Sequence, residues 1–159
     1  MQQNQSDKTF TFDEILRKAE SYCAYQERCH TEVIQKLKTF SSSETVIDNA
    51  VVHLIEHNFL NEERFACSYA RGKHRIKHWG KIRIVRELTA RSISKHNIDK
   101  ALKEIDSEEY LANFHILSEK IWTSISEINI QKKKKKFCDY LLRKGFETSL
   151  IYEKLQDLT

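Results

Sequence analysis

Apolar residues recur in this 159-residue sequence at matching positions about fifty residues apart. Leu37, Leu88 and Leu141 can be taken as equivalent positions, and they lie 51 and 53 residues apart. The residues four before, ten after and fourteen after each of them are all apolar: Val33, Ile84 and Phe137; Ile47, Ile98 and Ile151; Val51, Leu102 and Leu155. A period in this range is typical of modular arrays, in which each repeat is one supersecondary unit.

The composition predicts that these units are helical. The chain has no proline and three glycines, so it offers few signals for hairpin turns, and its 31% charged and 40% hydrophobic residues place it in the globular class. We therefore expect an all-α fold, a tandem array of three three-helix-bundle repeats. The expected segments are a disordered tail over residues 1–9, a first repeat over 10–58, a second over 59–106 and a third over 107–159.

Capping residues mark where several of these helices begin. Thr11 with Glu14, and Ser41 with Glu44, have the spacing of a capping box, in which side chain and backbone cap each other. Asn61 is a good N-cap for the first helix of the middle repeat. In that helix we expect an apolar stripe formed by Phe65, Tyr69 and Ile76. Gly80 is expected to supply the unhindered backbone that ends it, and Gly145 has the same place in the third repeat.

Positive charge is concentrated in the middle repeat. Residues 71–91 contain eight basic residues and one acidic residue, a net charge of +7, whereas the whole chain carries only +4. Such local basicity favours a docking face for a polyanion or an acidic protein surface. Helical geometry places Arg83 and Arg86 about 60° apart, away from the apolar positions of their helix, so we expect both to be exposed. Trp79 either packs at the corner between two helices or is exposed as a binding anchor.

A run of five lysines, residues 132–136, lies in the third repeat. If one helix runs through it, a lysine near position 133 or 134 must cover the apolar stripe, with its ammonium group reaching out to water. The run is either a solvated helix face or a second contact for an anionic partner.

Several functional classes receive no support. The four cysteines form no C-x-x-C pair and are expected to be reduced thiols. His53 and His57 have the spacing of a metalloprotease helix, but Glu56 does not occupy the H-E-x-x-H position. No catalytic signature is present, so we expect no enzyme activity, no cofactor and no metal. No apolar run could span a membrane, the N-terminus lacks a signal peptide core, and we expect a cytoplasmic protein.

The middle repeat resembles the RecX family of bacterial recombination regulators. The resemblance rests on residues 59–66 (FLNEERFA), the Tyr69-x-Arg71 step, residues 77–84 (KHWGKIRI) and the pair Glu87-Leu88, within an array of three repeats. It covers nearly the whole chain from about residue 10. The chain departs from many relatives at Lys81, where they have proline after the glycine, and at Arg91-Ser92, where they have a lysine-glycine pair.

The resemblance implies an elongated, curved protein that binds the RecA recombinase and its filament on single-stranded DNA and mainly inhibits ATP hydrolysis and strand exchange. It implies roles in DNA recombination, repair and the SOS response, and a monomer. The alternative is a sequence-independent DNA-binding protein, and a weak direct DNA contact is left open. The candidate contacts for RecA or DNA are Arg64, Tyr69, Arg71, Lys73, Arg75, Lys77, Trp79, Lys81, Arg83, Arg86, Lys132, Lys133, Lys135 and Lys136.

Overall fold

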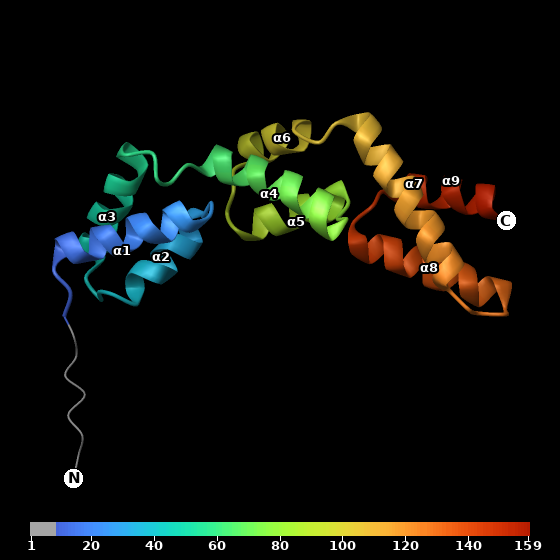
Figure 1. The fold of residues 1–159 in the computed structure, drawn as a ribbon, viewed down its shortest axis with the longest axis horizontal. Helices are drawn as coiled ribbons and strands as arrows, with labels where there is room; N and C mark the ends of the chain where they lie inside the picture. Colours follow the sequence, from blue (N-terminus) through green and yellow to red (C-terminus); the bar gives the residue numbers. More distant parts are fainter. Residues whose placement is uncertain (1–8) are drawn as a thin grey trace, which may run out of the picture. The chain divides into compact units, whose positions relative to one another are not determined.

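The structure, a computed structural model, describes residues 9–159. This part of the chain contains nine α-helices and no strand (Figure 1). The helices are α1 (Phe12–Tyr25), α2 (His30–Lys38), α3 (Glu44–Glu56), α4 (Glu62–Lys77), α5 (Lys81–Ala90), α6 (Lys95–Lys103), α7 (Ser107–Ser124), α8 (Ile130–Lys144) and α9 (Thr148–Leu158). The tail expected over residues 1–9 lies, except for Thr9, outside the described residues.

The chain forms two compact units, which meet in sequence within α4. The first extends to Phe65, and α1, α2 and α3 in it pack against one another. Its core consists of Ile15, Ala19, Cys23, Val33, Leu37, Ile47, Ala50, Leu54 and Leu60. The second unit runs from Ala66 to Thr159 and contains the rest of α4 together with α5 to α9.

The fifty-residue repeat is confirmed by burial. Leu37, Leu88 and Leu141 are fully buried, and they lie on α2, α5 and α8. The positions four before and ten after them are buried in all three copies, whereas the positions fourteen after them are half-buried in all three. Each of these equivalent positions therefore has the same degree of burial in all three copies, as expected when each three-helix unit builds its core from the same helix faces.

The predicted caps at Thr11 and Asn61 are present, but the helix expected to begin at Ser41 has a different cap. The Thr11 hydroxyl accepts from the Glu14 amide while the Glu14 carboxylate accepts from the Thr11 amide, and the Asn61 side chain accepts from the Arg64 amide at 2.9 Å. The N-cap of α3, however, is Ser43, whose hydroxyl accepts from the Val46 amide. The Ser41 hydroxyl instead accepts from the Ser43 amide, so the predicted box at Ser41 was wrong by half a turn.

The prediction of an apolar stripe on α4 is wrong at the C-terminal end of the helix. Phe65 is buried, but Ile76 is 73% exposed. The buried side chains of α4 in the second unit are Ala66, Ala70 and His74, which lie one turn apart. Ile76 lies about 120° around the helix from Ala70, so it points away from this face. Two alanines and a histidine gave no apolar signal strong enough to identify the buried side.

Candidate interaction site

The second and third repeats meet where α5 begins and α8 ends. The Gly80 amide donates to the Lys144 carbonyl at 2.7 Å, and the Ile82 amide donates to the Gly145 carbonyl at 3.0 Å. Between them, the Lys81 amide donates to the Tyr110 hydroxyl at 3.1 Å. The first amides of a helix and its last carbonyls have no partner within the helix, and here each set satisfies the other. The negative end of the α8 dipole also meets the positive end of the α5 dipole. We call this contact the joint.

Two glycines allow this close approach. A Cβ atom on Gly80 would lie 2.3 Å from the Gly145 carbonyl oxygen, and one on Gly145 would lie 2.2 Å from the Arg83 Cβ. Gly145 also has a φ of +91°, as predicted for a glycine that ends a helix. The expected role of Gly80 was wrong: α4 ends at Lys77, His78 has the positive φ that follows it, and Gly80 is the N-cap of α5.

Buried polar side chains complete the joint. The Tyr110 hydroxyl donates to the Glu147 carboxylate at 2.6 Å, and burial together with this hydrogen bond raises the pKa of Tyr110 above its ordinary range. His74 is 1% exposed; its Nδ1 lies 3.0 Å from the Trp79 carbonyl oxygen and its Nε2 3.0 Å from the Asn113 side-chain nitrogen. Because a carbonyl can only accept and an amide nitrogen can only donate, these contacts fit a neutral imidazole protonated at Nδ1.

Five cations surround the joint: Lys77, Arg83, Arg86, Arg143 and Lys144, which we call the joint cations. The Lys144 ammonium donates to the Lys77 carbonyl at 2.9 Å, and the Arg83 guanidinium donates to the Arg143 carbonyl at 3.1 Å. A carbonyl oxygen positions a cation but does not neutralise it. Burial, with the charges of Arg83 and Lys77, lowers the pKa of Lys144 below its usual value. The first turn of α5 contains no acidic residue, and the Glu147 carboxylate at the joint accepts from the Tyr110 hydroxyl. Positive charge is therefore concentrated at the joint.

Three small hollows lie at or next to the joint: two are lined by joint cations, and the other shares Tyr140 with one of these two. The first, of about 380 Å³, is lined by His78, Asn113, Ile116, Leu117, Lys120, Ile121 and Tyr140. The second is lined by Arg83, Tyr140, Arg143 and Lys144, and the third by Arg83, Arg86, Leu142 and Arg143. Tyr140 is common to the first and second hollows, and Arg83 and Arg143 are common to the second and third. None of the described residues that line these hollows is acidic. We call the three together the basic groove.

Trp79 packs at the corner between α4 and α5 and is half-buried. Its ring lies edge-on to Tyr69, with centroids 6.2 Å apart. The Arg83 guanidinium lies 4.1 Å from the centroid of the indole ring, and the Lys73 ammonium lies 5.0 Å from it. The packing alternative is therefore the one observed, although the indole remains partly accessible within a cluster of cations. The Lys81 ammonium likewise lies 4.6 Å from the Tyr110 centroid.

Two predicted contact residues on α4 have acidic partners within the chain, and their contact with RecA or DNA remains a prediction. Arg71 pairs with Glu104 at 2.7 Å, and Arg75 pairs with Glu109 through two hydrogen bonds. The hydrogen bond from Arg75 and its charge lower the pKa of Glu109, and the same pair raises the pKa of Arg75. These pairs connect α4 to the end of α6 and the first turn of α7, so most of their charge is compensated within the second unit.

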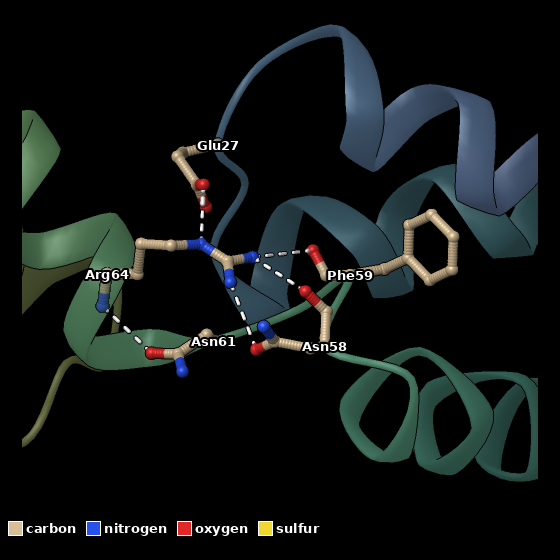
Figure 2. A network of polar contacts seen from close by, with 5 residues as sticks. All are labelled: Glu27, Asn58, Phe59, Asn61 and Arg64. Carbon is tan, nitrogen blue, oxygen red and sulfur yellow. Dashed lines mark hydrogen bonds and ion pairs between the residues drawn. The ribbon is translucent and has the colours of Figure 1, made fainter.

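Arg64 belongs to the first unit, where all of its guanidinium nitrogens have partners (Figure 2). It donates to the Glu27 carboxylate at 2.6 Å, to the Asn58 side chain at 3.0 Å, and to the carbonyls of Asn58 and Phe59. Asn58 has a positive φ of 60°. Arg64 thus holds the turn between α3 and α4, and its predicted contact with a partner remains a prediction.

The lysine run lies in the first turns of α8, and most of its side chains interact with other residues of the chain. Lys135 pairs with Asp139 at 2.7 Å, and Lys136 pairs with Glu127 at 3.0 Å. The Lys133 ammonium lies 4.5 Å from the Trp122 centroid, which confirms that a lysine near position 133 covers the apolar stripe. Lys132 is exposed.

The prediction from the sequence was wrong about the exposure of one groove residue, Arg83, and did not include two others, Arg143 and Lys144. Arg86 is exposed, but Arg83 is half-buried and its Nε is enclosed without a hydrogen-bond partner. The expectation that both would be exposed together was therefore wrong, because Arg83 faces the end of α8. Arg143 and Lys144 were not among the predicted contacts. Their position directly before Gly145 was the only available signal, since cations favour a helix C-terminus.

The remaining candidates form no site among residues 9–159. His53 pairs with Glu20 at 2.7 Å and stacks on His57, and no group of three metal-ligating side chains was found in this range. The four cysteines are free thiols, and burial raises the pKa of Cys23 and of Cys138. No helix in the described part of the chain is long and apolar enough to cross a membrane.

Comparison with known proteins identifies both repeats of the second unit. The family model for the second three-helix domain of RecX matches residues 61–102, and the model for the third three-helix domain matches residues 108–155. Proteins named regulatory protein RecX from Bacillus cytotoxicus and Bacillus thuringiensis are each 28% identical to the chain over 138 residues, which is 87% of this chain and 51% of theirs. The chain therefore spans about half the length of these curated relatives.

Solved structures show the same fold. The crystal structure of RecX from Lactobacillus salivarius superposes with a TM-score of 0.77 at 26% identity, over 92% of this chain and 96% of that one. A second crystal structure, of a regulatory protein RecX, has a TM-score of 0.77 at 24% identity, over 91% of this chain and 74% of that one.

Proposed function

We propose that this chain, which belongs to the RecX family of regulatory proteins, binds the RecA recombinase and its filament on single-stranded DNA. In this proposal the chain has no catalytic activity, acts as a monomer in the cytoplasm, and restrains ATP hydrolysis and strand exchange by RecA. The observation that carries the proposal is the pair of RecX domain matches over residues 61–102 and 108–155, which together include every residue that lines the basic groove.

The charge distribution supports binding through the second unit. The joint cations have no acidic partner lining the basic groove, whereas Arg71, Arg75, Lys135 and Lys136 are paired with carboxylates. An uncompensated cluster attracts an anionic partner and raises its association rate. The predicted contacts Lys73, Lys77, Trp79, Lys81 and Arg86 lie on or beside this cluster, and we retain them as proposed contacts. Three linked repeats would also let one chain touch several protomers of a filament.

The proposal is tested by measuring RecA-catalysed ATP hydrolysis on single-stranded DNA with increasing amounts of this protein. We expect progressive inhibition, and we expect RecA to be retained on the immobilised protein at about 0.2 M salt, where weak contacts with bare DNA are reduced. Unchanged hydrolysis together with no retention of RecA would contradict the proposal. Retention without inhibition would leave RecA as the partner but refute the inhibitory role.

A second candidate is a sequence-independent DNA-binding protein. It is favoured by the cluster of Tyr69 and Trp79 with the cations of Lys73 and Arg83, because single-stranded nucleic acids bind to aromatic rings next to positive charges. Binding to DNA in the absence of RecA that falls steeply with salt, combined with no retention of RecA, would favour this candidate.

A further inference from the structure

We propose that the basic groove is a docking site for an acidic protein segment that contains interspersed apolar side chains. This inference rests on the proposed function, since it gives the chemistry of the partner surface that the second unit would recognise. It names a different recognition element from the aromatic cluster of Tyr69 and Trp79, which lies outside the three hollows.

The charge of the groove requires an anionic occupant. Arg83, Arg143 and Lys144 line one hollow together, and no acidic residue of the described chain lines any of the three. The hydrogen bonds of Arg83 and Lys144 go to backbone carbonyls, which leave both positive charges in place. The enclosed Nε of Arg83 still lacks an acceptor. A carboxylate entering the hollow would supply a counter-charge to groups that now repel one another.

The apolar part of the groove distinguishes a peptide from a nucleic acid. Ile116 is 68% exposed beside the first hollow, and Leu142 is 43% exposed beside the third. Ile116 shares the first hollow with Lys120, and Leu142 shares the third with three arginines. Exposed aliphatic side chains next to cations match a segment in which acidic and apolar residues alternate along a helix face. Bases would need exposed aromatic rings to stack on. Two rings line the groove: the Tyr140 ring already has the Lys144 ammonium 5.7 Å from its centroid, and the other is the smaller imidazole ring of His78.

The test uses the full chain and a fluorescently labelled peptide of about 15 residues in which glutamates are interspersed with leucines. Two further probes are a glutamate–serine peptide of equal length and charge and an oligothymidylate of similar length. Binding is measured by fluorescence anisotropy at about 0.15 M salt. We expect the glutamate–leucine peptide to bind more tightly than either of the other probes.

Matched variants locate the site. Arg86→Glu/Arg143→Glu reverses two exposed charges of the groove, whereas Lys95→Glu/Lys103→Glu reverses two exposed charges elsewhere in the same unit. We expect the first variant to weaken peptide binding by at least on the order of tenfold and the second to leave it nearly unchanged. Ile116→Ser/Leu142→Ser should reduce binding of the glutamate–leucine peptide and leave the weaker glutamate–serine peptide unaffected.

Three outcomes would overturn the inference. Oligothymidylate binding that is tighter than peptide binding and is lost in Arg86→Glu/Arg143→Glu would assign the groove to nucleic acid. Sedimentation showing a dimer that this variant dissociates would assign it to a second copy of the chain. Absence of binding to every probe would leave the groove without a ligand. If any of these occurred while RecA hydrolysis was still inhibited, the inference would fail and the proposed function would stand.

Discussion

The cations of the second unit fall into two groups that differ in their surroundings. At the joint, Arg83 and Lys144 donate to carbonyl oxygens and line a groove that lacks acidic residues in the described chain. Along α4 and the start of α8, by contrast, Arg75, Lys135 and Lys136 have carboxylate partners within 3.0 Å. The five-lysine run has the highest density of positive charge in the sequence, yet two of its lysines have carboxylate partners. The cations Arg83 and Lys144 at the joint donate to carbonyls. Local charge density therefore does not reveal which charges are available to a partner.

The contacts that surround the two groups of cations should also contribute differently to the stability of the fold. The joint cations surround backbone-to-backbone contacts between two repeats, whereas the paired cations form exposed ion pairs. Exposed pairs contribute little because solvent and salt screen them. Changes in the backbone contacts of the joint should thus cost much more stability than changes in the ion pairs.

The largest effect is expected from Gly80→Ala. The new Cβ would meet backbone atoms of Gly145 and Phe146 at 2.3 to 2.5 Å, which cannot move aside as a flexible side chain could. We expect a loss of about 3 kcal/mol in the free energy of unfolding, measured by chemical denaturation. Gly72→Ala is the control, because no atom lies within 4 Å of its Cβ position on α4. This variant should gain about 0.5–1 kcal/mol from improved helix propensity. Equal stability of the two variants would refute the close contact at the joint.

The next largest effect is expected from Tyr110→Phe. Removing the hydroxyl leaves the Lys81 amide without its acceptor and the Glu147 carboxylate without its donor. Losing one partner of a buried hydrogen bond costs about 1–3 kcal/mol, again measured by chemical denaturation. Tyr152→Phe is the control, because Tyr152 is exposed. A cost for Tyr110→Phe no greater than that of the control would show that the hydroxyl does not hold the joint.

Reversing groove charges should alter function with little change in stability. Because Arg86 and Arg143 are exposed, Arg86→Glu/Arg143→Glu should change the free energy of unfolding by about 1 kcal/mol or less. We expect the concentration that half-inhibits RecA hydrolysis to rise on the order of tenfold. For Lys95→Glu/Lys103→Glu, which reverses two exposed charges outside the groove, the expected change is small. If the two variants, both shown to be folded by circular dichroism, inhibited RecA equally, the groove would not be the contact.

The smallest effect is expected from the exposed pair of Arg75 and Glu109, and it should depend on pH. The folded pKa of Glu109 lies below its ordinary value of 4.5, so the stabilisation is present above that value and is lost as the pH falls through the folded pKa. Arg75→Met should thus lower the melting temperature slightly near neutral pH and have no effect in strong acid. Lys132→Met is the control. A difference from the parent that grew on acidification would contradict the ion pair.

The sequence alone determined the fold class and the repeat. The positions of Leu37, Leu88 and Leu141 and their apolar neighbours follow from local periodicity, which each helix needs in order to bury one face. Residues 59–66 and 77–84 were sufficient to indicate the family. The caps at Thr11 and Asn61 were also predictable, since a cap depends on residues only three apart.

What local patterns could not give is how one repeat contacts the next. The joint brings Gly80 to Gly145 and Lys81 to Tyr110, residues 65 and 29 positions apart, and its hydrogen bonds use backbone groups that every residue possesses. For the same reason, Arg83 could not be recognised as half-buried, nor Arg143 and Lys144 as part of a groove. Whether a cation is paired, buried or free depends on which helix ends lie beside it, and this was decided only by the tertiary structure.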